Sequence, residues 1–276
     1  SIDNQIRGLR KGVHIIIATP GRLIDLVNRG AADLSSVTTL VLDEADEMLN
    51  MGFREDIEFI LGNTPNKNSI WLFSATMPAK IKNLASKILV HPKEIALSIS
   101  KPAAGVTQNV ILCFDEQKNK ALDFILKERT HYDSIIIFTS AKSKVHEIVY
   151  ALKKAGYKNT QGVSSNLEQE EREEVLRGFR SKRTRILVAT DVMSRGIDIK
   201  EINLVINYDA PRDAEDYVHR IGRTGRAQAI GDAISFITSE DTTALRALER
   251  FIGRGLVRKR PDGFDFSAPA PPAPPA

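Results

Sequence analysis

The chain of 276 residues carries 39 Lys and Arg against 35 Asp and Glu, a net charge of +4, with 42% hydrophobic and 27% charged residues. This balance excludes a disordered or fibrous protein, and the length allows two ordinary domains or one large one. No apolar run approaches the roughly 20 residues of a membrane helix, and the first residues lack a signal-peptide pattern. The single cysteine, Cys113, lies in an apolar run, where we expect a buried small side chain. We expect a cytoplasmic protein whose mild basicity permits a polyanionic partner without requiring one.

Short apolar runs alternate with helical patterns along the chain. The apolar runs predict strands at residues 15–18, 40–42, 70–73, 135–138, 186–189 and 204–206. Because these runs are continuously apolar, they suit strands buried on both faces of a parallel sheet. Apolar residues at helical spacing predict amphipathic helices at 81–89, 145–152 and 214–221. This alternation predicts an α/β fold with doubly wound parallel sheets.

A break in the alternation divides the chain. Residues 98–105 are mostly small and polar and include Pro102 and Gly105, which indicates an interdomain linker, with a surface loop inside one domain as the alternative. We expect a first domain at 1–98, a linker at 99–107 and a second domain at 108–253. Residues 254–276 are first basic and then rich in Pro and Ala, a composition that predicts a disordered tail.

The strand predicted at 40–42 runs directly into an acidic cluster formed by Asp43, Glu44 and Asp46. A buried strand that ends in paired carboxylates can hold Mg²⁺ and a water beside a nucleotide phosphate. The alternative is structural, since Asp is also common at strand ends and helix caps.

Polar residues follow other predicted strands as well. Hydroxyl, acidic or arginine side chains come after the runs at 15–18, 70–73, 135–138 and 186–189. In open α/β sheets, ligands bind outside the carboxyl ends of the strands. The repeated pattern therefore favours a polar ligand crevice in both domains, although helix capping explains any one of these residues taken alone.

A turn rich in glycine and arginine follows the helix predicted at 214–221. Gly222 and Gly225 allow the backbone to turn sharply. Arg223 and Arg226 therefore both project from one short loop, and His219 lies just before that loop. Two guanidinium groups so placed suit a polyphosphate, because each can make bidentate charge-assisted hydrogen bonds. A solvated basic turn is the alternative interpretation.

Together these elements resemble the motifs of a DEAD-box RNA helicase of superfamily 2, a family built on two RecA-like domains in tandem. Residues 43–46 read Asp-Glu-Ala-Asp, and residues 74–76 read Ser-Ala-Thr, as in the family's third motif. Residues 19–22, Thr-Pro-Gly-Arg, resemble the RNA-contacting motif of the first domain. Residues 135–140, 169–172, 189–198 and 219–226 resemble the fourth motif, the Gln-x-x-Arg element, the fifth motif and the sixth motif.

The resemblance implies a role for each matching residue. Asp43 would hold Mg²⁺ through water, Glu44 would orient or deprotonate the attacking water, and Arg223 and Arg226 would act as arginine fingers. The family's RNA grip implies backbone contacts that are largely independent of sequence. The other implied roles are ATP binding by Gly196 and Asp198, coupling of ATP state to domain closure by Asp46, Ser74, Thr76 and His219, and RNA binding by Thr19, Gly21, Arg22, Thr139, Gln169, Arg172, Thr190 and Arg195.

One departure from the family pattern concerns nucleotide binding. The adenine-reading glutamine motif and the phosphate-cradling loop Gly-x-x-x-x-Gly-Lys-Thr do not occur, and the dipeptide Gly-Lys is absent from the sequence. We therefore expect a helicase chain that lacks the front of its first RecA-like domain and does not hydrolyse ATP by itself. The alternatives are a truncated RNA-binding fragment without turnover and a different P-loop ATPase such as a DNA translocase. The elements at 19–22 and 169–172 weigh against the translocase.

Overall fold

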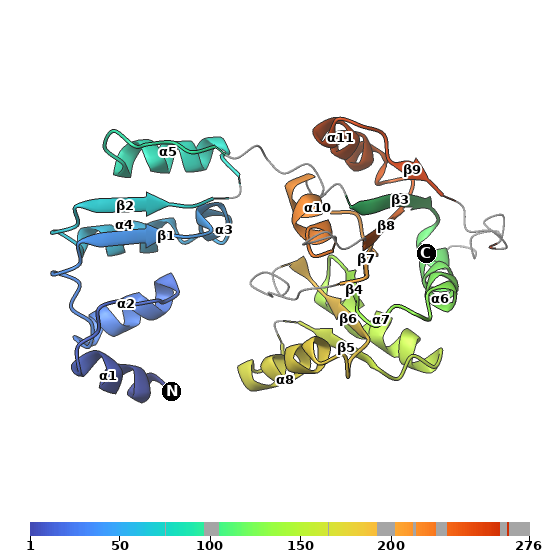
Figure 1. Cartoon of the computed structure of the whole chain (residues 1–276), viewed down its shortest axis with the longest axis horizontal. Helices are drawn as coiled ribbons and strands as arrows, with labels where there is room; N and C mark the ends of the chain where they lie inside the picture. The colour runs from blue at the N-terminus through green and yellow to red at the C-terminus, as the bar shows by residue number, and fades with distance from the viewer. Residues whose placement is uncertain are drawn as a thin grey trace, which may run out of the picture. The chain divides into compact units, whose positions relative to one another are not determined.

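The computed structural model describes residues 1–74, 76–96, 105–164, 166–191, 202–211, 214–224, 231–259 and 264. The chain divides into two compact units, Ser1–Ile99 and Ser100–Ala276 (Figure 1). Within the described residues, no helix is long and apolar enough to cross a membrane.

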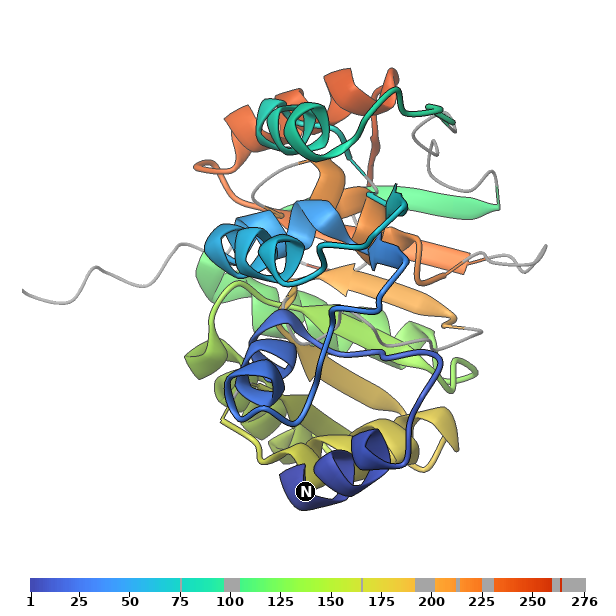
Figure 2. The ribbon, with the colours of Figure 1, turned by 90° about the vertical axis from the view of Figure 1, so that its left-hand side faces the viewer.

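The first unit is built around two parallel strands, with the order helix, helix, strand, helix, helix, strand, helix. Its elements are α1 (Ile2–Arg10), α2 (Pro20–Asn28), β1 (Thr39–Leu42), α3 (Ala45–Asn50), α4 (Arg54–Gly62), β2 (Ser69–Leu72) and α5 (Ala79–Ile88). β1 and β2 pair in register from Thr39 opposite Ser69 to Leu42 opposite Leu72. In Figures 1 and 2, α5 lies at one end of this unit and α1 at the other, with the strand pair between them.

One face of the strand pair forms a small core. Leu42 packs there with Ile57 of α4 and Leu84 of α5. The opposite face is open: Val41 and Trp71 are about half exposed, at 50% and 55%. The prediction of strands buried on both faces is therefore wrong for this unit, because the described helices of the core cluster cover only one side.

The strand predicted at 15–18 does not form. Residues 15–18 adopt no regular secondary structure, and Ile15 and Ile17 are 79% and 94% exposed. An apolar run becomes a strand only when another strand lies beside it to accept and donate its hydrogen bonds. Among the described residues, the sheet of the first unit contains only β1 and β2.

In its described part, the second unit contains a seven-stranded sheet in which every pair of neighbours is parallel, in the order β5-β6-β4-β7-β8-β3-β9. The strands are β3 (Val106–Leu112), β4 (Ile135–Phe138), β5 (Thr160–Val163), β6 (Ile186–Ala189), β7 (Leu204–Asn207), β8 (Gly231–Ile237) and β9 (Val257–Arg258). The helices among the described residues are η1 (Asp115–Gln117, a 3₁₀ turn), α6 (Lys118–Glu128), α7 (Lys142–Lys154), α8 (Gln169–Arg180), α10 (Ala214–Ile221) and α11 (Thr242–Ile252).

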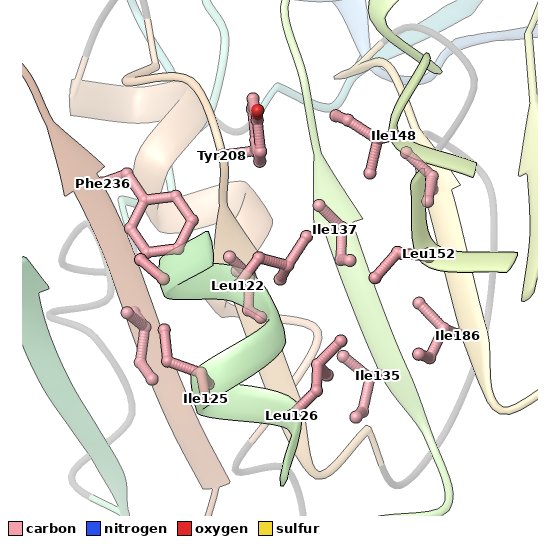
Figure 3. Packing of buried hydrophobic residues seen from close by; sticks show 14 of the residues in the cluster. Leu122, Ile125, Leu126, Ile135, Ile137, Ile148, Leu152, Ile186, Tyr208 and Phe236 are labelled. Atoms are coloured by element: carbon pink, nitrogen blue, oxygen red, sulfur yellow. The ribbon is translucent and has the colours of Figure 1, made fainter. Parts of the chain in front are cut away.

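Helices cover both faces of this sheet, as the continuous apolar runs predict. Figure 3 shows one face, where Leu122, Ile125 and Leu126 of α6 pack against Ile135 and Ile137 of β4. Helix α7 completes this layer, while α8, α10 and α11 pack on the opposite face. Strands β4, β6 and β7 are fully buried. The doubly wound α/β prediction is confirmed.

Two stretches differ from the expected boundaries. β3 begins at Val106, so the last residues of the expected linker pair with β8, while residues 97–104 lie outside the described part. The expected tail is partly folded, because β9 pairs with β3 and Leu256 is buried. Phe264 also packs on the core, with its ring edge-to-face against Phe124 at 6.0 Å between centroids. Residues 265–276, the Pro/Ala-rich part, are outside the described residues.

Cys113 is buried at 9% exposure, as expected from its apolar run. Burial raises the pKa of its thiol to about 11. The burial of this side chain confirms the interpretation of Cys113 as a small buried residue.

Candidate functional site

Strand β1 ends in two exposed carboxylates. Asp43 accepts a hydrogen bond at its Oδ1 from the backbone N–H of Glu44 at 3.0 Å. Glu44 adopts the left-handed conformation (φ 51°, ψ 48°), which costs a residue with a side chain about 1–3 kcal/mol. The backbone N–H of Ala45 donates to the carbonyl of Phe73 at 3.0 Å and fixes the chain just after this strained residue. The turn thus leaves Asp43 and Glu44 in solvent at the carboxyl end of the sheet.

The third acid of the cluster has a different environment. Asp46 is 3% exposed, and its Oδ2 accepts hydrogen bonds from the backbone N–H of Thr76 at 3.0 Å and from the Thr76 hydroxyl at 2.9 Å. The backbone N–H of Asp46 donates to the hydroxyl of Ser74 at 3.3 Å, and that hydroxyl donates to the Thr76 carbonyl at 2.7 Å. Three of the residues expected to couple ATP state to closure are therefore one hydrogen-bonded unit that joins the end of β1 to the end of β2.

The exposed pair has the chemistry of a magnesium site. Mg²⁺ prefers oxygen ligands, keeps several waters and usually takes one or two carboxylates from a protein. Asp43 and Glu44 offer two such carboxylates, while Asp46 is occupied by Thr76. The donor set therefore fits Mg²⁺ held largely through water.

The Thr-Pro-Gly-Arg element forms the start of helix α2. Thr19 is the N-cap residue, Pro20 occupies the first helical turn, and Thr19 and Gly21 are exposed. The first turn contains no acidic residue. Arg22 is exposed, and its Nη1 donates to Oε1 of Gln5 at 3.4 Å. An exposed helix start with a cation beside it suits a phosphate group.

In the second unit, Asp209 is the centre of a buried polar network at the carboxyl ends of β4 and β7. It is 8% exposed, and its Oδ2 accepts hydrogen bonds from the hydroxyl of Thr139 at 2.6 Å and from the backbone N–H of Ser140 at 2.9 Å. Its Oδ1 accepts from the ammonium groups of Lys144 at 3.0 Å and Lys118 at 3.3 Å. One carboxylate thus holds together two strand ends and the beginnings of α6 and α7.

Interactions within this network keep the side chains of Asp209 and Lys118 ionised. Burial alone would raise the pKa of the Asp209 carboxyl, yet hydrogen bonds from Ser140, Thr139 and Lys144 hold that pKa well below its ordinary value of 3.8. Burial would lower the pKa of Lys118, but Asp115 and Asp209 hold it above its ordinary value of 10.5. Both groups therefore stay charged across the physiological range.

Arg220, on α10, connects the same region to the end of β6. Its Nε and Nη2 donate to the two carboxylate oxygens of Asp191 at 2.5 and 2.7 Å, and Nη1 donates to the Asp209 carbonyl at 2.9 Å and to Oδ1 of Asn207 at 3.1 Å. The guanidinium also lies over the ring of Phe138, 5.3 Å from its centroid. At 3% exposure, Arg220 ties the helix that precedes the Gly-Arg turn to three strand ends.

The Gly-Arg turn begins directly after α10. His219, in the last turn of the helix, and Arg223 are both half-buried. A side chain at Gly222 would meet the Val218 carbonyl at 2.9 Å, so this position requires glycine. The hydroxyl of Thr224 donates to the carbonyl of Ile202, which fixes the turn beside the sheet.

The other expected RNA contacts of the second unit have mixed environments. Gln169 and Arg172 lie in the first turn of α8, where Gln169 Nε2 donates to Glu173 at 2.8 Å and acidic residues surround both. Thr190, after β6, is 9% exposed. Thr139 is fully buried and its hydroxyl donates to Asp209, so its side chain does not reach the surface. The exposed residue there is Ser140, whose hydroxyl also donates to Asp209, at 3.1 Å. Gly196, Asp198, Arg195 and Arg226 lie outside the described residues.

Sequence reasoning missed the residues that organise the second unit, Asp209 and Arg220. Asp209 follows a predicted strand, as do the acids and hydroxyls that were singled out, so the rule that polar residues gather at carboxyl strand ends could have found it. Arg220 lies inside the stretch that resembles the sixth motif, but its structural role had no signal, since its partners lie 11, 13 and 29 positions away.

Comparison with known proteins supports the same motifs. A family model described as DEAD/DEAH box helicase matches residues 1–84, and one described as helicase conserved C-terminal domain matches residues 117–228. The DEAD-box ATP-dependent RNA helicase CshA of Bacillus licheniformis is 43% identical over 96% of this chain and 54% of its own length. CshA of Bacillus subtilis is 42% identical over 96% of this chain and 53% of its length. The chain thus spans about half the length of these curated relatives.

Solved structures of the same kind are also similar. The Saccharomyces cerevisiae protein Dbp5, bound to RNA and ADP BeF3, aligns with a TM-score of 0.81 and 30% identity over 88% of this chain and 65% of that one. A DEAD box protein of Methanococcus jannaschii aligns with a TM-score of 0.54 and 40% identity over 94% of this chain and 70% of that one. The Escherichia coli DEAD-box protein SrmB, bound to RraA, is 32% identical, with a TM-score of 0.55, over 60% of this chain and 96% of that one.

Proposed function

Because the chain belongs to the DEAD-box helicase family, we propose that it provides the metal, arginine and RNA-gripping parts of an ATP-dependent RNA helicase, which couples ATP hydrolysis to RNA binding and local duplex unwinding. The observation that carries this proposal is that the three acids after β1 lie in two different environments. Asp43 and Glu44 are exposed, whereas Asp46 is buried in hydrogen bonds with Thr76. A purely structural acidic cluster would not need the left-handed Glu44 that separates the two environments.

On the nucleotide side, Asp43 would hold Mg²⁺ through water and Glu44 would orient the attacking water. The bound metal would neutralise charge on the phosphates. Arg223 and Arg226 would stabilise the charge that develops during phosphoryl transfer, a contribution of about 10³–10⁵ in rate in analogous enzymes. Gly196 and Asp198 would contact the nucleotide.

The buried unit formed by Asp46, Ser74 and Thr76 would transmit the nucleotide state, together with His219. Its hydrogen bonds link the strand end that carries the carboxylates to the strand end that leads into α5. A displacement of Asp43 would therefore shift the end of β2 as well.

On the RNA side, Thr19, Gly21 and Arg22 present an exposed helix start and a cation to the backbone phosphates. Hydroxyl, amide and arginine groups position a backbone without reading bases, so binding would be independent of sequence and would weaken with salt. Thr139 would act indirectly, because its buried hydroxyl holds the end of β4 in place beside Ser140. The other contacts proposed are those of Gln169, Arg172, Thr190 and Arg195.

We further propose that this chain binds RNA without hydrolysing ATP by itself, since its sequence contains no phosphate-cradling loop. The test compares RNA-stimulated ATPase of this chain with that of an extended chain, in which the corresponding N-terminal segment of CshA from Bacillus subtilis precedes Ser1. We expect turnover in the extended chain only. Turnover by the 276-residue chain would overturn the proposal of an inactive chain. Equal stimulation of the extended chain by DNA would overturn the RNA assignment.

A further inference from the structure

A pocket of about 240 Å³ opens among the last three helices of the first unit. Its lining comes from α3, α4 and α5 and consists of Leu49, Arg54, Lys80, Asn83, Leu84 and Lys87. None of these residues belongs to the motifs of the candidate site. The pocket is smaller than the roughly 300–1,000 Å³ of a typical small-molecule site, and it is of a size to receive one apolar side chain.

The pocket combines an apolar floor with a basic rim. Leu84 is 6% exposed and belongs to the core of the unit, with Leu49 packed against the same cluster. Lys80, Leu84 and Lys87 are spaced along α5 so that they share one side of the helix. The ionisable side chains of the lining are all cationic, and within the described residues no ion pair is formed by Lys80 or Lys87.

The ion pair of Arg54 does not neutralise the positive charge of the pocket rim. Its Nε donates to Oε1 of Glu58 at 3.1 Å, but the two side chains are 61% and 55% exposed. A pair so exposed is screened by water and contributes little. The guanidinium can therefore exchange Glu58 for an incoming carboxylate at small cost.

We propose that this pocket docks a short acidic segment of a partner protein, with one leucine or phenylalanine side chain on Leu49 and Leu84 and flanking carboxylates on Lys80, Lys87 and Arg54. Binding sites for protein segments commonly use a buried apolar anchor inside a polar rim. A nucleic-acid backbone would satisfy the cations but leave the apolar floor without a partner. The complementary occupant is therefore an acidic peptide with an apolar anchor.

The test measures fluorescence anisotropy of a short labelled peptide in which glutamates flank a central Leu-Phe pair, with the 276-residue chain as receptor. We expect saturable binding that weakens with salt. The double variant Lys80→Glu with Lys87→Glu should lower affinity by about tenfold or more, because it places like charges opposite each other. Asn83→Trp, at an exposed position, should also block binding by filling the pocket without removing a core contact.

The matched control is Lys82→Glu with Lys93→Glu. It changes the net charge equally at exposed residues outside the pocket lining, and we expect affinity within about twofold of the parent chain. Equal loss in the control and the pocket variant would show a non-specific charge effect and overturn the proposal. Absence of binding to the parent chain would overturn it too, as would binding that survives alanine in place of the Leu-Phe pair. If the pocket variant lost RNA affinity and kept the peptide, the pocket would be an RNA site instead.

Discussion

Arg220 and Asp191 form a bidentate pair, with nitrogen–oxygen distances of 2.5 and 2.7 Å, that joins α10 to the end of β6. Because Arg220 is 3% exposed and also donates to Asn207, its loss leaves several buried acceptors unsatisfied. We expect Arg220→Ala to destabilise the second unit by about 3 kcal/mol or more, measured as a shift of the urea midpoint by circular dichroism. Arg177→Ala serves as the control, since its pair with Glu174 is 3.9 Å long and exposed, and should change stability by less than about 0.5 kcal/mol.

Asp209 predicts how stability depends on pH. Its pKa is lower in the folded protein than its ordinary value of 3.8, so its contribution is fully present above that value. The contribution is then lost as the pH falls toward the folded pKa, because the unfolded state binds the proton first. We expect the urea midpoint to fall as the pH drops below about 4. Asp209→Asn should be less stable than the parent at pH 7 and should show a smaller fall on acidification; an unchanged pH profile would contradict this role.

Substitution of Asp43 should affect turnover and not stability, whereas substitution of the neighbouring Asp46 should lower stability. Asp43→Ala should leave stability within about 0.5 kcal/mol, because its side chain is exposed, but should abolish turnover in the extended chain. Asp46→Ala should cost about 1–3 kcal/mol, because the buried N–H of Thr76 loses its acceptor. Thermal unfolding followed by the fluorescence of Trp71 measures the first unit. Similar losses of stability in both variants would contradict the proposed division of roles.

Arg223 should matter for catalysis and not for RNA affinity. In the extended chain, Arg223→Ala should reduce turnover by about 10³-fold or more if it acts as an arginine finger. RNA affinity, measured by anisotropy without nucleotide, should stay within about threefold of the parent chain, because one phosphate-directed charge at most is removed. Normal turnover in this variant would show that Arg223 has another role.

The sequence predicted the strands of the second unit best where both faces are covered. Runs such as Ile135–Phe138 are continuously apolar because α6 and α7 lie on one face and α8 on the other. β5, with the residues Thr160–Val163, was not predicted, because a short edge strand tolerates Gln and Gly. β3 and β8 were not predicted either. β8 is buried on both faces, but Asp232 and Ser235 interrupt its apolar run. The strand predicted at 15–18 did not form, since an apolar run does not show whether a neighbouring strand is present to pair with it.

The candidate site shows the same limit. Asp43, Glu44 and Asp46 were found because they are adjacent, but their different exposure depends on Thr76, which lies 30 positions from Asp46. The burial of Thr139 follows from Asp209, 70 positions later. A motif locates a polar residue at a strand end, whereas the fold decides whether that residue faces solvent or holds the strand end in place.

The open face of the β1–β2 pair carries a fluorescent side chain that reports whether this face is covered. Trp71, the single tryptophan of the chain, is 55% exposed there, with the ring of Phe73 edge-to-face at 6.4 Å. Large exposed apolar surface promotes association, so the isolated chain should self-associate as its concentration rises. Any segment or second copy that covers this face will transfer the indole from water to an apolar environment. A blue shift of tryptophan emission will then record the event without a label, and the same signal will reveal whether the N-terminal segment of the extended chain has folded against β1 and β2.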